Sequence, residues 1–180
     1  MVEKNEIRVT GFGGQGIILS GYIIGKAACL YDKKYATLVQ TYGPESRGSA
    51  CRADLLVSTR YIDYPHISVP DVLIALSQDG YTKYITNLKA NALVLIDDEL
   101  VDANPLPDGI RLHKIPSTRI AEDTGSKIVT NMVMIGFFAS VADLVSTEAL
   151  EKAVLTSVPR GTETLNQRAF QRGLEFIGKE

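Results

Sequence analysis

Four glycines within six residues dominate the start of this chain, in the segment Gly11-Phe-Gly-Gly-Gln-Gly16, here called the glycine loop. Residues 6–10 before it alternate as in a strand, and apolar residues at helical spacing follow it. Glycines allow positive φ and a close approach of the backbone to a ligand, and free N–H groups at a helix start favour an anion. The sequence therefore predicts a strand, a loop and a helix whose start can hold a nucleotide, a phosphate or a carboxylate.

The glycine spacing also fits a dinucleotide-binding loop, but the rest of that motif is missing. Dinucleotide-binding proteins carry an acid at the end of the second strand, about 20 residues on. The only acid in that range, Asp32, precedes the predicted second strand, and no Gly-Lys-Ser/Thr follows the glycines as in a P-loop. A stand-alone NAD- or nucleotide-binding protein remains an alternative. So does a loop whose glycines only allow the helix to pack tightly on the sheet.

Hydrophobic periodicity predicts an α/β fold over residues 1–180, as a single three-layer α/β/α domain. Gly21 and Gly25, four residues apart on one helix face, indicate close packing of the first helix on the sheet. The link between the second and third strands is too short for a crossover helix, so these strands pair antiparallel if they pair, and the sheet is mixed and mostly parallel. The expected strands are 6–10, 35–41, 50–59, 71–77, 92–97 and 111–115. The expected helices are 16–31, 79–88, a single turn at 119–123, 130–144, one capped by Ser146 and ended by Pro159, and 162–177.

A second unusual loop, Tyr42-Gly-Pro-Glu-Ser-Arg-Gly-Ser49, follows the second predicted strand. Pro44 stiffens it, and Glu45 and Arg47 bring opposite charges together. If the second strand is parallel to the first, this loop emerges at the same sheet edge as the glycine loop, which is where open α/β folds bind ligands. The alternative is a solvated surface ion pair.

Composition excludes several classes of protein. A formal net charge of −2 and a pI near 5.7 argue against a nucleic-acid partner. The N-terminus lacks the features of a signal peptide, and polar residues interrupt the longest apolar stretches, so we expect no membrane span and a cytoplasmic protein. Cys29 and Cys51 lie outside any CxxC spacing and cannot hold zinc or an iron–sulfur cluster by themselves; we expect both to be buried and reduced. The tyrosines around the first helix, among them Tyr22 and Tyr35, are expected to pack rather than to bind a ligand.

Taken together, the two loops resemble the gamma subunit of 2-oxoacid:ferredoxin oxidoreductases, through Gly-x-Gly-Gly-Gln-Gly and Tyr-Gly-Pro-Glu-x-Arg-Gly. Ser49 departs from that family, which commonly has a second glycine there. The resemblance extends over the whole chain and is closest to the branch that acts on 2-oxoglutarate. Further similar stretches are Asp-Val-Leu-Ile-Ala-Leu-Ser-Gln at 71–78, Asn131-Met before a buried helix, and Asn166-x-x-Ala-Phe-x-x-Gly173.

This resemblance implies a subunit of a complex that oxidatively decarboxylates a 2-oxoacid to an acyl-CoA and passes electrons to ferredoxin. It implies thiamine diphosphate, Mg²⁺ and [4Fe-4S] clusters on partner subunits, namely alpha, beta and a ferredoxin-like delta subunit or domain. The gamma subunit is then inactive alone, holds no catalytic residue, and helps to cover the active site and bind coenzyme A. A purely structural docking role for the two loops is the alternative. The expected site residues are Gly11, Gly13, Gly14, Gln15, Gly16, Tyr42, Glu45, Arg47, Ser49 and Asn131.

Overall fold

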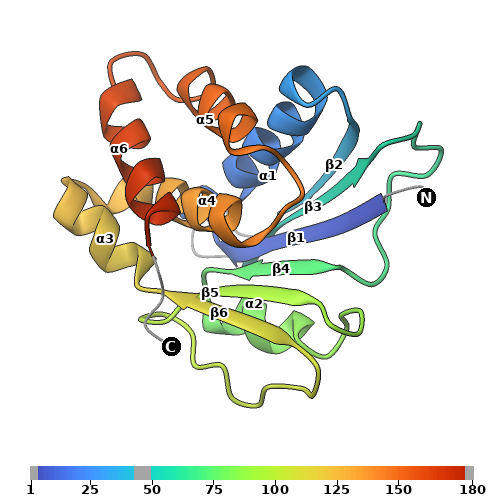
Figure 1. Ribbon diagram of the computed structural model, residues 1–180. Helices are drawn as coiled ribbons and strands as arrows, with labels where there is room; N and C mark the ends of the chain where they lie inside the picture. Colours follow the sequence, from blue (N-terminus) through green and yellow to red (C-terminus); the bar gives the residue numbers. More distant parts are fainter. Residues whose placement is uncertain (1–3, 43–49, 177–180) are drawn as a thin grey trace.

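The fold is centred on a six-stranded sheet in the order β2-β3-β1-β4-β5-β6, seen in a computed structural model that describes residues 4–42 and 50–176 (Figure 1). Strand β3 is antiparallel to both of its neighbours, whereas β1, β4, β5 and β6 pair in parallel, so only β3 runs against the rest. This confirms the predicted mixed, mostly parallel sheet and the antiparallel pairing of the second and third strands. The strands are β1 (Lys4–Phe12), β2 (Tyr35–Thr41), β3 (Ala50–Ser58), β4 (Val72–Ala75), β5 (Leu93–Asp97) and β6 (Arg111–Ile115).

Helices cover both faces of the sheet, but unequally. Figure 1 shows α1, α4, α5 and α6 stacked over one face and α2 alone on the other. The three-layer arrangement follows from strands whose residues are apolar on both faces. The helices are α1 (Ile17–Lys26), continued by a π-helical turn η1 (Ala27–Tyr31), then α2 (Gln78–Tyr84), α3 (Ser117–Thr124), a 3₁₀ turn η2 (Lys127–Val129), α4 (Thr130–Val141), α5 (Thr147–Leu155) and α6 (Glu163–Leu174).

Two apolar clusters fill the layers. The larger lies between the sheet and the helices α1, α4, α5 and α6, and it contains Phe137 and Phe138 as the apolar pattern of their helix predicts. The smaller lies under α2 and is built around Tyr81, Leu73 and Val94. Successive side chains of a strand point to opposite faces, which is why neighbouring residues of β4 and β5 divide between the two clusters.

Several boundaries differ from the predicted ones. Strand β1 extends to Phe12, so Gly11 pairs with Cys51 inside the sheet and does not lie in a turn. The single turn expected at 119–123 is an eight-residue helix that begins at Ser117, because the side chains there bond to a buried carboxylate described below. Helix α2 ends at Tyr84, earlier than expected.

One expectation about burial was wrong. Cys29 is exposed, although Cys51 is buried as predicted. Tyr22 and Tyr35 are about half exposed, and Tyr35 packs edge to face against Tyr61. These exposed residues lie on α1, η1 and β2, and β2 is the outermost strand of the described sheet.

Several loops meet at the carboxyl edge of the sheet, where the parallel strands end. The glycine loop follows β1 there, and Tyr42 follows β2. Asp97 is the last residue of β5 and Ser117 follows β6, so both stand at the same edge. Ligands of open α/β folds bind outside this edge.

Candidate functional site

The glycine loop turns sharply from β1 into α1. Gly14 and Gly16 have φ of 98° and 72°, in the left-handed region that favours glycine. Gly16 is the N-cap of α1, and no side chain caps this helix start. The first N–H groups of α1 are therefore free to bond to an anion, and the helix dipole favours one.

The side chain of Gln15 fastens the loop to the sheet. Its carbonyl oxygen Oε1 accepts from the Phe12 N–H at 2.6 Å, and its amide Nε2 donates to the Leu76 carbonyl at 2.8 Å. The Gln15 amide thus joins the end of β1 to the end of β4. A Cβ on Gly11 would lie 2.5 Å from Oε1, so the glycine there makes room for this brace. Gln15 holds the loop in shape through both ends of its amide.

Asn131 lies against the loop from the first turn of α4. It is 3% exposed, and its Nδ2 is 3.5 Å from the Gly16 carbonyl oxygen. A Cβ on Gly16 would lie 2.3 Å from that nitrogen. The structure therefore brings Asn131 and Gly16 together across 115 residues of sequence, as contact partners.

A cavity of about 290 Å³ opens beside the loop. It brings one cation, two hydroxyl-bearing side chains and apolar surface next to the start of α1. Lys127 makes no ion pair with any described residue, and its neighbour Ile128 is 83% exposed. The lining residues are Gly14, Gln15, Leu100, Thr118, Lys127, Ile128 and Thr130.

One wall of this cavity is set by a buried carboxylate. Asp97 is fully buried, and its Oδ2 accepts from the Ser117 hydroxyl at 2.6 Å. The same oxygen accepts from the N–H and the hydroxyl of Thr118, at 2.8 and 2.6 Å. A carboxylate at the start of a helix satisfies its free N–H groups. Asp97 therefore fixes α3, and Thr118 with it, at the edge of the cavity.

An acidic cavity of about 430 Å³ adjoins the first one and shares Leu100 with it. Burial and the charges of Asp97 and Glu99 raise the pKa of Asp98 there, because each disfavours its ionised form. Arg119 pairs with Glu99, and Lys114 also lines this second cavity. The first cavity differs from it in that Lys127 lines it and no carboxylate among the described residues does.

The predicted site is only partly brought together. Tyr42 is 66% exposed and bonds to Gln40 at 2.6 Å. Strand β3 lies between β2 and β1, so Tyr42 is two strands from the glycine loop along the carboxyl edge. The expected residues Glu45, Arg47 and Ser49 lie outside the described residues. Ala50, the first described residue after them, pairs with Phe12 at the end of β1.

Lys127, Ile128 and Thr118 were not predicted from the sequence. The sequence did hold one indication of Lys127 and Ile128, because they stand just before Asn131 at the start of an apolar helix. Thr118 follows β6, and a parallel strand places the residue after it at the carboxyl edge. No short motif marks any of the three, because they reach the cavity from separate elements.

Neither a metal centre nor a membrane span is found in the part of the chain that the structure describes. Residues 4–42 and 50–176 contain no group of three or more His, Cys, Asp or Glu placed to hold a metal ion. None of the helices in these ranges is long and apolar enough to cross a bilayer.

Comparison with known proteins gives consistent matches. The family model for pyruvate ferredoxin/flavodoxin oxidoreductase matches residues 6–176. The chain is 47% identical over 179 residues to the 2-oxoglutarate synthase subunit KorC of Methanocaldococcus jannaschii, covering 98% of this chain and 95% of that protein.

Solved structures share the fold. The gamma subunit of a keto/oxoacid ferredoxin oxidoreductase from Geobacter sulfurreducens matches with a TM-score of 0.86 and 39% identity, over 96% of this chain and 95% of that one. The 2-oxoglutarate:ferredoxin oxidoreductase from Magnetococcus marinus, solved with 2-oxoglutarate, coenzyme A and succinyl-CoA bound, matches with a TM-score of 0.83 and 24% identity. That match covers 96% of this chain and 30% of the longer chain, and it speaks for the fold alone.

Proposed function

The chain belongs to the pyruvate ferredoxin/flavodoxin oxidoreductase family as the gamma subunit of a 2-oxoglutarate:ferredoxin oxidoreductase complex, and we propose that in this complex it helps to bind coenzyme A and to cover the active site. The single observation that carries the proposal is the cavity beside the glycine loop. It combines an uncapped helix start, exposed glycine backbone and the cation of Lys127. Coenzyme A is a polyanion, and its phosphates suit such a surface.

The size of the cavity supports a shared site. At about 290 Å³ it lies just below the range for small-molecule pockets, roughly 300–1,000 Å³. It can therefore take a phosphate-bearing part of coenzyme A while partner subunits contribute the remainder. The exposed Ile128 at the rim offers apolar contact to such a partner.

Strand order argues against the alternative of a self-sufficient NAD-binding protein. In a dinucleotide-binding fold the second strand lies directly beside the first, so that its terminal acid reaches the ribose near the glycine loop. Here β3 separates β2 from β1, and β2 ends in Gln40 and Thr41. No acid at the end of β2 can bind a ribose at the loop.

The chemistry of the reaction belongs, in this proposal, to the partner subunits. They supply thiamine diphosphate, Mg²⁺ and the iron–sulfur clusters, through alpha, beta and a ferredoxin-like delta subunit or domain, and ferredoxin accepts the electrons in the cytoplasm. The glycine loop, Asn131 and Lys127 contribute binding and orientation of coenzyme A, together with Tyr42, Glu45, Arg47 and Ser49 of the second loop.

Steady-state kinetics of the assembled complex carrying Lys127→Gln tests this role. Loss of one charge-assisted hydrogen bond to a phosphate corresponds to roughly a tenfold rise in the KM for coenzyme A. The kcat and the KM for 2-oxoglutarate stay unchanged, because Lys127 holds neither the oxoacid nor the reacting atoms in this proposal.

Lys152→Gln is the matched control, since Lys152 lies exposed on α5 away from the cavity. An unchanged KM for coenzyme A in the Lys127 variant contradicts the proposal. If that variant instead weakens assembly of the subunits, the loop is a docking surface and binds no small molecule.

A further inference from the structure

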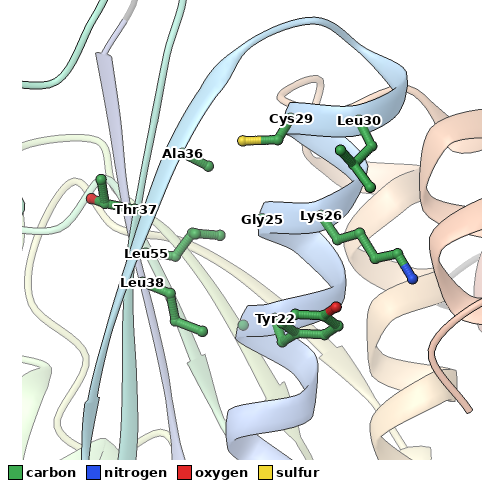
Figure 2. Close-up of a pocket in the computed structure, with 10 residues that line it drawn as sticks. Tyr22, Gly25, Lys26, Cys29, Leu30, Ala36, Thr37, Leu38 and Leu55 are labelled. Carbon is green, nitrogen blue, oxygen red and sulfur yellow. The ribbon is translucent and has the colours of Figure 1, made fainter.

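An open groove runs between α1 and the edge strand β2, and it shares no lining residue with the cavity at the glycine loop. Its volume is about 280 Å³, and its walls are mostly apolar. Figure 2 shows Ala36 and Leu38 of β2 pointing toward α1, and the sulfur of Cys29 pointing across the groove toward β2. Gly21 and Gly25 form the part of α1 that faces the sheet, and the groove is lined from the helix side by Tyr22, Lys26, Cys29 and Leu30.

Strand β2 lacks the usual protection of an edge. It is the outermost strand of the sheet and pairs only with β3, so the N–H and C=O groups of its other side have no strand partner among the described residues. Its sequence, Tyr-Ala-Thr-Leu-Val-Gln-Thr over seven residues, contains neither a charged residue nor a proline. Natural proteins usually place lysine, proline or a bulge on such an edge, because an unprotected one pairs with other chains. An edge of this kind is typical of a strand that is covered in an assembly.

Exposed apolar side chains gather around the same edge. Five of the eight large apolar side chains that are exposed in the described residues lie there, and one of them, Leu30, is 65% exposed. The Tyr35 and Tyr61 rings meet edge to face with 6.0 Å between centroids. Exposed aromatic clusters of this kind mark protein interfaces. The five are Tyr22, Leu30, Tyr35, Tyr42 and Tyr61.

The charges at the rim of the groove favour a partner of opposite sign. Lys26 lines the groove and donates to the Thr156 carbonyl at 2.9 Å, which does not neutralise its charge. Lys34 likewise donates to a carbonyl, and Lys33 is exposed. None of the three pairs with an acid among the described residues. A second copy docked about a two-fold axis would set lysines against lysines, whereas an acidic segment is attracted.

We propose that β2 and the α1/β2 groove bind an extended, apolar and acidic segment of a partner subunit, which pairs with β2 as a seventh strand. Backbone hydrogen bonds along β2 supply affinity, and apolar side chains of the segment enter the groove between Leu38 and Leu30. Acidic residues of the segment meet Lys26 and Lys33. The inference rests on membership of the chain in a multi-subunit complex and does not depend on the cavity beside Lys127.

Assembly from separately purified subunits tests the surface. Leu30→Glu places a like charge where the acidic segment docks and removes an exposed apolar contact, so the dissociation constant for the partner subunits rises at least tenfold. Leu106→Glu is the matched control, since Leu106 is also exposed but lies in the connection between β5 and β6. Equal effects of the two variants, or none from Leu30→Glu, overturn the proposal.

Thiol labelling gives a second readout that needs no variant. Cys29 is exposed in the chain and reacts with iodoacetamide when the subunit is alone. In the assembled complex the segment covers the groove, so the rate of labelling at Cys29 falls at least tenfold. Cys51 is the internal control, because it is buried in the chain itself and burial raises the pKa of its thiol.

If Cys29 is labelled at the same rate in the isolated subunit and in the assembled complex, the proposal is contradicted. Sedimentation of the isolated subunit identifies the occupant: a monomer at all concentrations is expected. A concentration-dependent dimer that Leu30→Glu abolishes assigns the surface to a second copy and overturns the assignment to a partner subunit. A failed test of the coenzyme A site leaves these outcomes unchanged.

Discussion

Glycines bring helices close to their neighbours in two regions of this molecule, with opposite results. Where α4 crosses α6, a Cβ on Gly136 would lie 1.9 Å from the Phe170 carbonyl oxygen, and one on Gly173 would lie 1.9 Å from the Val133 carbonyl oxygen. The two backbones therefore touch. On α1, a Cβ at Gly25 would lie 3.0 Å from a methyl carbon of Leu55. That contact is with the end of a side chain.

The two regions differ in what surrounds the glycines. The crossing of α4 and α6 borders the main core, and Phe137, Phe138 and Phe170 are buried beside it. The groove at α1 stays open because β2 is the outermost strand of the described sheet. Glycine thus allows two helices to pack tightly beside the core in one place. In the other it lines a groove that, in our proposal, receives a partner.

Gly136→Ala is expected to have the largest effect on stability. Neither the Phe170 carbonyl nor the α6 backbone can move aside without separating the helices, so the free energy of unfolding falls by at least about 3 kcal/mol. For a chain of this length that lowers the Tm by about 6 °C or more. Urea and thermal unfolding of the purified chain measure both quantities.

The control for this substitution is Ser140→Ala, one turn further along α4 at an exposed position. It removes only a local hydrogen bond from the Ser140 hydroxyl to the Phe137 carbonyl. If Gly136→Ala unfolds at the same temperature as Ser140→Ala, the helices do not cross with their backbones in contact.

Gly16→Ala at the glycine loop should have an intermediate effect. Alanine at φ of 72° costs about 1–2 kcal/mol, and its Cβ also overlaps the Asn131 side chain, which must shift. We expect a loss of about 2 kcal/mol in the free energy of unfolding, and a raised KM for coenzyme A in the complex.

Gly14→Ala separates the two causes. Gly14 has φ of 98°, but a Cβ there would have no neighbour within 4 Å, so only the backbone strain remains. The structure predicts a smaller loss for Gly14→Ala than for Gly16→Ala. The reverse order, measured by urea unfolding, contradicts the packing of Asn131 against the loop.

Local patterns predicted the fold well. The alternation in β1, the short link between β2 and β3 and the apolar character of α4 each depend on neighbours in sequence, and the sheet and its mixed pairing follow from them. The extent of α3 could not be predicted from local pattern, because its first turn is fixed by Asp97, 20 residues before Ser117. Exposure of Cys29 was missed for a related reason: it depends on β2 lying at the edge of the sheet, and local pattern does not reveal strand order.

The site could be predicted only where it lies in one segment. The glycine loop is continuous in sequence, and Asn131 was included because the family resemblance pointed to it. Lys127, Thr118 and Leu100 come from three other segments, and only the folded sheet edge brings them to one cavity. Glycine motifs also mislead in one respect, since Gly11 serves to accommodate the Gln15 side chain and lies inside β1.

Gly25→Ala is expected to change stability least, and it sharpens the comparison between the two glycine regions. Alanine raises helix propensity by about 1 kcal/mol, and Leu55 can turn its methyl group aside, so the net change stays within about 0.5 kcal/mol. Gly21→Ala, whose Cβ would lie 2.8 Å from the Cβ of Ala53, has no such freedom and should cost more.

In the complex, however, the new methyl group of Gly25→Ala narrows the α1/β2 groove and weakens assembly. A variant that is as stable as the parent chain but assembles less well separates a surface kept open for a partner from an interior that is merely tightly packed. A large loss of stability from Gly25→Ala would instead make the two regions alike.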